Sequence, residues 1–248
     1  MDFTYSGYVA MLNGLKQQGY VFTDYENYLQ HTRCVILRHD VDYSLEKALT
    51  LAELEKREGV TSTYMILVSS GFYNLMDCET QNILCQILNM GHHLGLHFDE
   101  ANYEVTDIKL LKNYVKEEMK LLRKCTGHEE ISVVSMHRPS KECLEADLDF
   151  TEEGMINSYG KTFFQDFKYV SDSRMSWREP VMDYIHKAVY ERMHILTHAF
   201  WYDTTQEDIK VKLERFLKQA WEDRYRLLNQ NFRDLQEYIS YDSRNTST

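Results

Sequence analysis

The stretch CVILRHDVDYS, Cys34 to Ser44, decides the fold class. Its first seven residues, Cys34 to Asp40, form an apolar run without alternation, which is typical of a buried strand in a parallel sheet. Ser44 is placed to cap a helix that runs to about Arg57 and ends at Gly59. The stretch therefore predicts one strand followed by one crossover helix.

The same alternation continues along most of the chain, which favours an α/β fold with a parallel sheet. Further strands are expected at Thr61 to Leu67, His92 to Phe98, Ile131 to His137, Met155 to Tyr159, Phe167 to Ser171 and His194 to Phe200. Further helices are expected at Tyr5 to Gln18, near Thr80 to Met90, near Asp107 to Arg123, and from a capping box at Thr204 and Glu207 to about Tyr238. A strand count near seven predicts an irregular (β/α)7-type barrel with an incomplete wall. We expect a single domain over residues 1–240 and a disordered tail at 241–248.

Composition narrows the function classes. The net charge of −11 argues against nucleic-acid binding, because such proteins display a basic face. The N-terminal segment lacks the pattern of an export signal, and no apolar run is long enough to span a membrane. Five scattered cysteines suit reduced thiols. We therefore expect a cytoplasmic protein that acts on a neutral or cationic substrate.

Polar residues follow the predicted strands at their carboxyl ends, where α/β barrels assemble active sites. They are Asp40, Asp42, His97, Arg138 and His198. Because the carboxyl ends of parallel strands meet at one rim, these side chains are expected to converge.

The aspartates of RHDVDYS share one face of an extended strand, about 7 Å apart. A divalent ion held by one of them would relieve their repulsion and acidify a water, while the other accepts a proton. The alternative is that the pair only turns the chain or caps the next helix. In GHHLGLHFDE, His93 and His97 would lie roughly 13 Å apart on a strand, so His97 is the better ligand and His92 and His93 are expected to be structural.

Two later motifs add candidate groups. In SMHRPS, Arg138 could hold a carboxylate with two hydrogen bonds, and His137 is either a third ligand or a packed structural histidine. Neighbours on a regular strand face opposite ways, so both can point inward only if the backbone twists there. In LTHAFWY, His198 is a candidate general acid beside Trp201.

The segment YVSDSRMSWRE adds residues on the acid side of the site. Asp172 could orient His198, and Trp177 could help to shape the substrate side, as Trp201 could in the neighbouring motif.

Taken together, HDVD, GLHFD, HRPS, YVSDS and LTHAFWY resemble the motifs of the polysaccharide deacetylases of carbohydrate esterase family four. The resemblance covers most of the chain from Leu37 to Tyr202. It implies that Asp40 is the catalytic base, that Arg138 orients it, and that His198 is the general acid.

The resemblance also implies that Asp42 and His97 bind the metal, Zn²⁺ or a similar ion, and that an acetyl group is removed from a carbohydrate. The family normally supplies a second metal histidine four residues after the first, where this chain has Ala101. His137, Asp99 or a solvent ligand would have to replace it. A milder departure is Ala199, where the family usually has proline.

Two other functions stay open. One is a catalytically inactive barrel that binds a glycan or a partner protein, although such a module would not need a base, its orienting cation and an acid together. The other is a metal-dependent hydrolase of another amide or a phosphoester; the acidic balance disfavours phosphoesters.

Overall fold

The computed structural model describes residues 1–105 and 107–241. The chain divides into two compact units, Met1–Thr204 and Thr205–Thr248. The predicted tail at 241–248 lies outside the described residues except for Tyr241. The single domain expected over residues 1–240 stays a prediction. No helix in the described ranges has the length and apolar character needed to cross a membrane.

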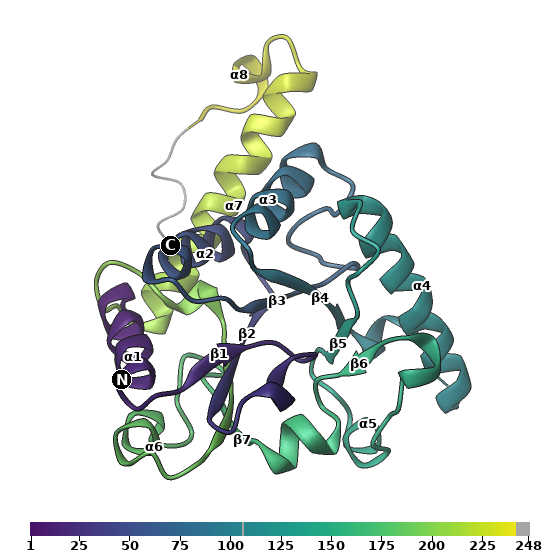
Figure 1. Cartoon of the computed structure of the whole chain (residues 1–248). Coiled ribbons are helices and arrows are strands. Elements are labelled where there is room, and N and C mark those ends of the chain that lie inside the picture. The colour runs from purple at the N-terminus through teal and green to yellow at the C-terminus, as the bar shows by residue number, and fades with distance from the viewer. Residues whose placement is uncertain (106, 242–248) are drawn as a thin grey trace. The chain divides into compact units, whose positions relative to one another are not determined.

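The first unit is a curled parallel sheet with helices against its outer face (Figure 1). Its strands are β1 Val21–Thr23, β2 Cys34–Val41, β3 Thr63–Ile66, β4 His93–Phe98, β5 Val133–Met136, β6 Ile156–Asn157, β7 Lys168–Ser171 and β8 Arg192–Thr197. Its α-helices are α1 Tyr5–Gln17, α2 Leu45–Glu58, α3 Cys78–Asn89, α4 Ile108–Thr126, α5 Lys141–Glu145 and α6 Val181–Lys187. Short 3-10 or π-helical turns are η1 Tyr28–Gln30, η2 Glu100–Asn102, η3 Thr151–Glu153, η4 Thr162–Asp166 and η5 Ala199–Trp201.

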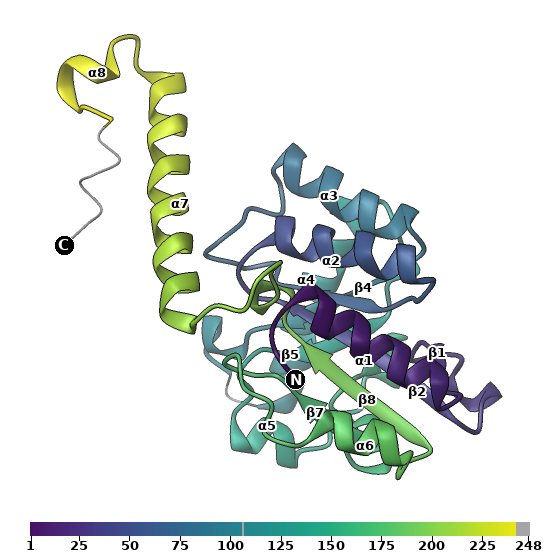
Figure 2. The same cartoon turned by 90° about the vertical axis from the view of Figure 1, so that its left-hand side faces the viewer.

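The strands follow the order β6-β5-β4-β3-β2-β8-β7, and every pair is parallel. β2 and β8 form a long pair, with Cys34 opposite Arg192 and His39 opposite Thr197 (Figure 2). Within the described ranges no pairing joins β6 to β7, so the wall of the barrel stays open there. The expected irregular (β/α)7-type barrel is confirmed.

One strand was missed by the sequence interpretation. β1 pairs with the first half of β2, from Val21 opposite Cys34 to Thr23 opposite Ile36, while β3 pairs with the second half. A strand of three residues is too short to give a readable periodicity.

The two ends of α2 follow the capping chemistry predicted for them. The Ser44 side chain accepts from the backbone of Lys47 at the start of α2, and Gly59 ends that helix with φ 68°. Glycine suits this left-handed position because it has no Cβ to clash with the carbonyl. The strand predicted from His194 to Phe200 ends earlier, at Thr197, because the chain turns into η5.

The second unit contains α7, Ile209–Asn231, and α8, Leu235–Tyr238. The predicted capping box at Thr204 and Glu207 is therefore wrong, since Asp208 occupies the position before the helix. Glu207 instead pairs with Arg215 at 2.8 Å. The predicted single helix to Tyr238 is broken between Asn231 and Leu235.

Candidate active site

Strand β2 and the residue directly after it contribute three charged side chains to the inner face of the curled sheet. Arg38, Asp40 and Asp42 alternate with His39 and Val41, and alternate residues of a strand share a face. All three are buried or nearly so, Arg38 completely. This segment therefore carries a cation and two carboxylates in a row toward the site.

The neighbouring strands bring histidines to the same rim. His97 comes from β4, His137 directly follows β5, and His198 directly follows β8. Asp172 directly follows β7. Of the residues predicted for the site, the structure thus brings Asp40, Asp42, His97, His137, His198 and Asp172 together.

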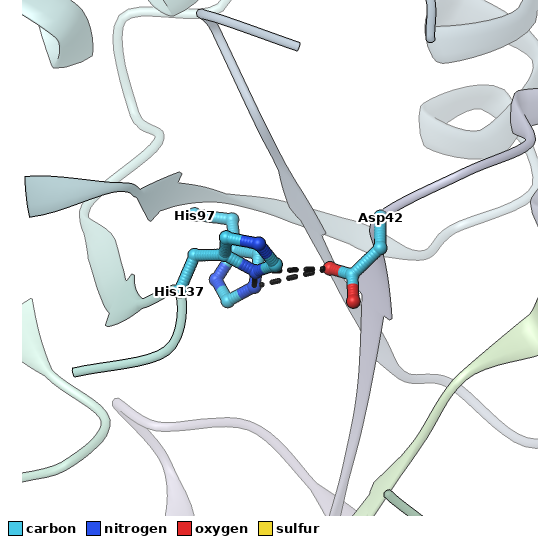
Figure 3. Close-up of side chains that lie close together, drawn as sticks. All are labelled: Asp42, His97 and His137. Carbon is cyan, nitrogen blue, oxygen red and sulfur yellow. Dashed lines mark hydrogen bonds and ion pairs between the residues drawn. The ribbon is translucent and has the colours of Figure 1, made fainter. Parts of the chain in front are cut away.

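Asp42, His97 and His137 form a compact group of possible metal ligands (Figure 3). Asp42 Oδ1 lies 3.3 Å from His97 Nε2 and 3.4 Å from His137 Nδ1. The two imidazole nitrogens are 3.1 Å apart. The three ligand atoms therefore form a nearly equilateral triangle.

This triangle fits a divalent ion. Tetrahedral zinc with bonds of about 2.0–2.1 Å has ligand-to-ligand edges of about 3.3 Å, and one carboxylate with two imidazoles is a common catalytic set. Asp42 Oδ1 is buried and, within the described part of the chain, has no hydrogen-bond partner. A buried carboxylate oxygen without a hydrogen bond is costly, so a cation at this position would remove that cost.

A hydrogen bond on the side of the His97 ring away from Asp42 fixes the orientation of that ring. Its Nδ1 is 2.6 Å from Ser135 Oγ on β5, and that hydroxyl lies 3.5 Å from the carbonyl of Leu96. If Ser135 donates to that carbonyl, it accepts from Nδ1, and the Nε2 lone pair of His97 is left for an ion.

Asp40 is held by a buried arginine on its own strand. Arg38 donates from Nε to Asp40 Oδ1 at 2.7 Å and from Nη2 to Oδ2 at 2.8 Å. Burial is the largest single effect and favours the neutral acid, but the charge and hydrogen bonds of Arg38 together with the charges of His97 and His198 outweigh it and lower the pKa of Asp40. Arg38 also bonds Ser158 at 3.2 Å and lies over the Tyr159 ring at 4.6 Å. The carboxylate is thus ionised and fixed in orientation.

His198 is held by Asp172 on the other side of the site. Its Nδ1 lies 2.6 Å from Asp172 Oδ1, and Tyr202 donates to Asp172 Oδ2 at 3.1 Å. Burial disfavours the imidazolium, but the charge and hydrogen bond of Asp172 raise the pKa of His198 to about 9. Nε2 faces Asp42 Oδ2 at 3.8 Å. The ring is therefore set to carry a proton at neutral pH.

The structure does not bring Arg138 to Asp40. The Arg138 side chain is 71% exposed and donates to Asp99 at 2.9 Å. The backbone of Arg138 is left-handed, with a φ of 48°, so the chain does twist after β5. Such a twist would allow both His137 and Arg138 to point inward, but the Arg138 side chain points outward. The orienting contact expected from Arg138 is made by Arg38 instead.

Asp99, the other side chain considered as a replacement for the missing histidine, and the two histidines expected to be structural all lie outside the ligand triangle. Asp99 caps η2 through the backbone of Ala101 and pairs with Arg138, so it is not part of the ligand triangle. His93 is half exposed, 3.8 Å from Asp24. His92 is buried and bonded to the carbonyl of Ala52 at 2.9 Å, a structural contact.

The two tryptophans predicted for the substrate side, Trp177 and Trp201, differ in their surroundings. Trp201 is buried, with its ring centre 6.4 Å from that of His198 and 5.9 Å from that of Tyr43. Trp177 instead lines a surface pocket of about 320 Å³, whose wall contains none of the candidate ligands or catalytic groups. Only Trp201 therefore borders the site.

The sequence interpretation missed three residues that support the site: Arg38, Ser135 and Tyr202. Arg38 had a readable signal, because it stands two residues before Asp40 on a predicted strand and so shares its face. Ser135 and Tyr202 had none, since their partners come from other strands.

No family model matches the sequence, and no curated protein matches it. Solved structures do. A family 4 carbohydrate esterase from Streptococcus mutans is 17% identical, with 74% of this chain and 82% of that chain covered and a TM-score of 0.51. One from Bacillus anthracis is 13% identical, with 86% of each chain covered and a TM-score of 0.46. A family 4 pseudoenzyme from Bacillus anthracis is 13% identical, with 76% of this chain and 62% of that chain covered and a TM-score of 0.47. The first likeness, together with the open parallel barrel, shows that the chain has the fold of the family 4 carbohydrate esterases, the polysaccharide deacetylase barrel.

Proposed function

We propose that this protein is a metal-dependent hydrolase that removes an acyl group, acetyl in the first instance, from a carbohydrate or glycan precursor. One observation carries the proposal. The ligand triangle of Asp42, His97 and His137 contacts both a carboxylate held by a buried arginine and a histidine held by a buried carboxylate.

The residues of the triangle would hold a divalent cation, with Zn²⁺ the best fit to one carboxylate and two imidazoles. When bound, such an ion lowers the pKa of water and polarises an acyl carbonyl. Asp42 contributes the one negative charge of the set, and Ser135 holds His97 in the ligating orientation.

Asp40 is proposed as the general base. Its Oδ2 lies 3.5 Å from His97 Nε2, so the carboxylate reaches the space in front of the triangle. Each of its oxygens accepts one bond from Arg38 and keeps a second lone pair for the proton of an attacking water. The lowered pKa keeps Asp40 ionised, as a base must be before the reaction.

His198 is proposed as the general acid. Asp172 binds its Nδ1, so Nε2 is the atom that can give a proton to the leaving amine or alkoxide. A pKa raised to about 9 keeps this proton in place at neutral pH. Asp172 holds the ring in the same way that a buried aspartate orients the histidine of a hydrolase triad.

A carbohydrate is proposed as the substrate because of the resemblance in motifs and the aromatic wall beside the acid. Tyr43 directly follows Asp42 and packs against Phe200 with ring centres 4.8 Å apart, and Trp201 completes the wall. Aromatic faces of this kind suit the C–H faces of a sugar or an acyl methyl group. Trp177 is proposed only as a substrate contact at a distance from the catalytic groups.

The first test is the metal content of protein purified without chelator, with acetate release from N- and O-acetylated sugars measured alongside. We expect about one equivalent of metal per chain in the wild type and its loss in Asp42→Ala, His97→Ala and His137→Ala. His93→Ala and Asp99→Ala serve as controls and should keep the metal, because neither side chain belongs to the triangle.

Two results would contradict the proposal. Retention of metal in His137→Ala together with its loss in Asp99→Ala would mean that the wrong third ligand was chosen. Absence of both metal and acetate release after zinc, cobalt or nickel is added would favour the inactive barrel that binds a glycan or partner.

A further inference from the structure

A second buried cluster lies on the opposite face of β2 from the site, and its centre is Glu55 of α2. Glu55 is completely buried. Its Oε1 accepts from Tyr8 at 2.6 Å and lies 2.8 Å from His39 Nε2. Its Oε2 accepts from Ser62 at 2.6 Å and from Tyr64 at 2.7 Å. Four side chains from three segments, namely α1, β2 and the chain around the start of β3, thus meet on one carboxylate.

Glu55 stays charged in this position. Burial by itself favours the neutral acid, but the neighbouring His39 and the bonds it receives lower the pKa of Glu55 to about 2. A buried carboxylate is tolerated only when it is paired and hydrogen-bonded, and here each of its two oxygens has two hydrogen-bond partners. The active-site chemistry described above uses none of these groups.

The first connection from this cluster to the site runs through β2 and β8. His39 stands between Arg38 and Asp40, and its Nδ1 is 2.6 Å from Thr197 Oγ1 on the neighbouring strand. Thr197 directly precedes His198. Because neighbours on a strand face opposite ways, this bond joins the two strands behind the base and the acid.

The second connection runs through two tyrosines. Tyr8 of α1 packs edge-on against Tyr202, with ring centres 5.2 Å apart. Tyr202 donates to Asp172, the partner of His198. Glu55 therefore reaches the His198 and Asp172 pair along two independent routes.

We propose that Glu55, acting through His39 and Thr197 and through Tyr8 and Tyr202, is a positioning residue that fixes the acid His198 relative to the base Asp40. The role in turnover rests on the proposed function. The positioning of His198 relative to Asp40 does not rest on that function, because it concerns only the geometry of strands β2 and β8. A misplacement of about 1 Å at reacting groups can lower a rate about 100-fold, so loss of one hydrogen bond between the strands should be measurable in kcat.

The test uses two variants and one control in the full chain. Thr197→Val removes the hydroxyl at constant shape, and Glu55→Gln removes the charge. Glu118→Gln is the matched control, since Glu118 is another buried carboxylate that accepts from a tyrosine, Tyr103, at 2.6 Å, outside this cluster.

Three quantities are measured at a temperature where near-ultraviolet circular dichroism shows all variants folded. They are kcat and KM for acetate release, the metal content, and the low-field NMR resonance of the His198 Nδ1 proton bonded to Asp172. The resonance is assigned by its loss in His198→Gln. We expect kcat to fall at least 10-fold in Thr197→Val, with KM and metal content within twofold of wild type and the resonance shifted. Glu118→Gln should leave all three unchanged.

The proposal is overturned if folded Thr197→Val keeps the wild-type resonance and kcat. If Glu55→Gln fails to fold, Thr197→Val and Tyr8→Phe, each removing one hydroxyl, decide the question. If the wild type releases no acetate with any metal, the proposed function fails, but the resonance still decides whether the cluster positions His198.

Discussion

Replacing Arg38 by methionine should be far more damaging than the same change at Arg138. Arg38 is completely buried and donates two hydrogen bonds to Asp40, whereas the Arg138 side chain is 71% exposed. Removing one partner of a buried ion pair leaves an uncompensated charge, which destabilises a protein by about 3–5 kcal/mol. An exposed pair is worth roughly 0–1 kcal/mol. We therefore expect the free energies of unfolding of the two variants to differ by about 2–5 kcal/mol.

The same contrast applies to activity. Without Arg38, burial raises the pKa of Asp40, so the base is partly protonated and no longer held in place. General-base catalysis contributes about 10²- to 10⁴-fold, and most of this factor should be lost in kcat for Arg38→Met. Arg138→Met should stay within about 10-fold of wild type, the effect of a rim contact of roughly 1 kcal/mol.

Urea unfolding gives the stability of each variant, and steady-state acetate release gives kcat. Arg38→Lys is the control for charge alone, since lysine keeps the cation but cannot make two parallel bonds. The reasoning is refuted if Arg138→Met loses activity by 100-fold or more while Arg38→Met retains it.

Three further outcomes are expected. Adding zinc at 100 times its dissociation constant should raise the free energy of unfolding of the apo protein in urea by about 2.7 kcal/mol, and His137→Ala should abolish that gain. An equal gain in the variant would show that His137 is not a metal ligand. His198→Gln should keep its metal yet lose about 10²- to 10⁴-fold in kcat, so a loss of metal would instead make His198 a ligand. Burial and the Arg38 charge lower the pKa of His194 to about 3, whereas the pKa in the unfolded chain is near 6.5. The neutral imidazole therefore contributes its full stability above pH 6.5, and this stability is lost as the pH falls toward 3. Between pH 7 and pH 4 the free energy of unfolding should fall by about 3 kcal/mol because of this residue, and His194→Gln should show a flatter pH dependence of unfolding. An equally steep pH dependence in the variant would refute the role of His194.

The sequence was sufficient for the architecture because local patterns determine where strands and helices form. Uniform apolar runs followed by capped helices indicate parallel strands with crossovers, and their carboxyl ends must meet at one rim. Asp40, Asp42 and His97 could therefore be placed on one rim from the sequence alone. The fold likeness confirms the architecture.

Only the tertiary structure separated Arg38 from Arg138 and brought His137 to the ligand triangle. Arg38 lies within a predicted strand and Arg138 directly follows one, and the left-handed backbone that turns Arg138 outward has no signature at a residue other than glycine. His137 meets His97 because β5 pairs beside β4, and the order of strands in a sheet depends on how the crossover helices pack. Strand positions follow from local periodicity, but the partner of each side chain depends on neighbours that are distant in the sequence.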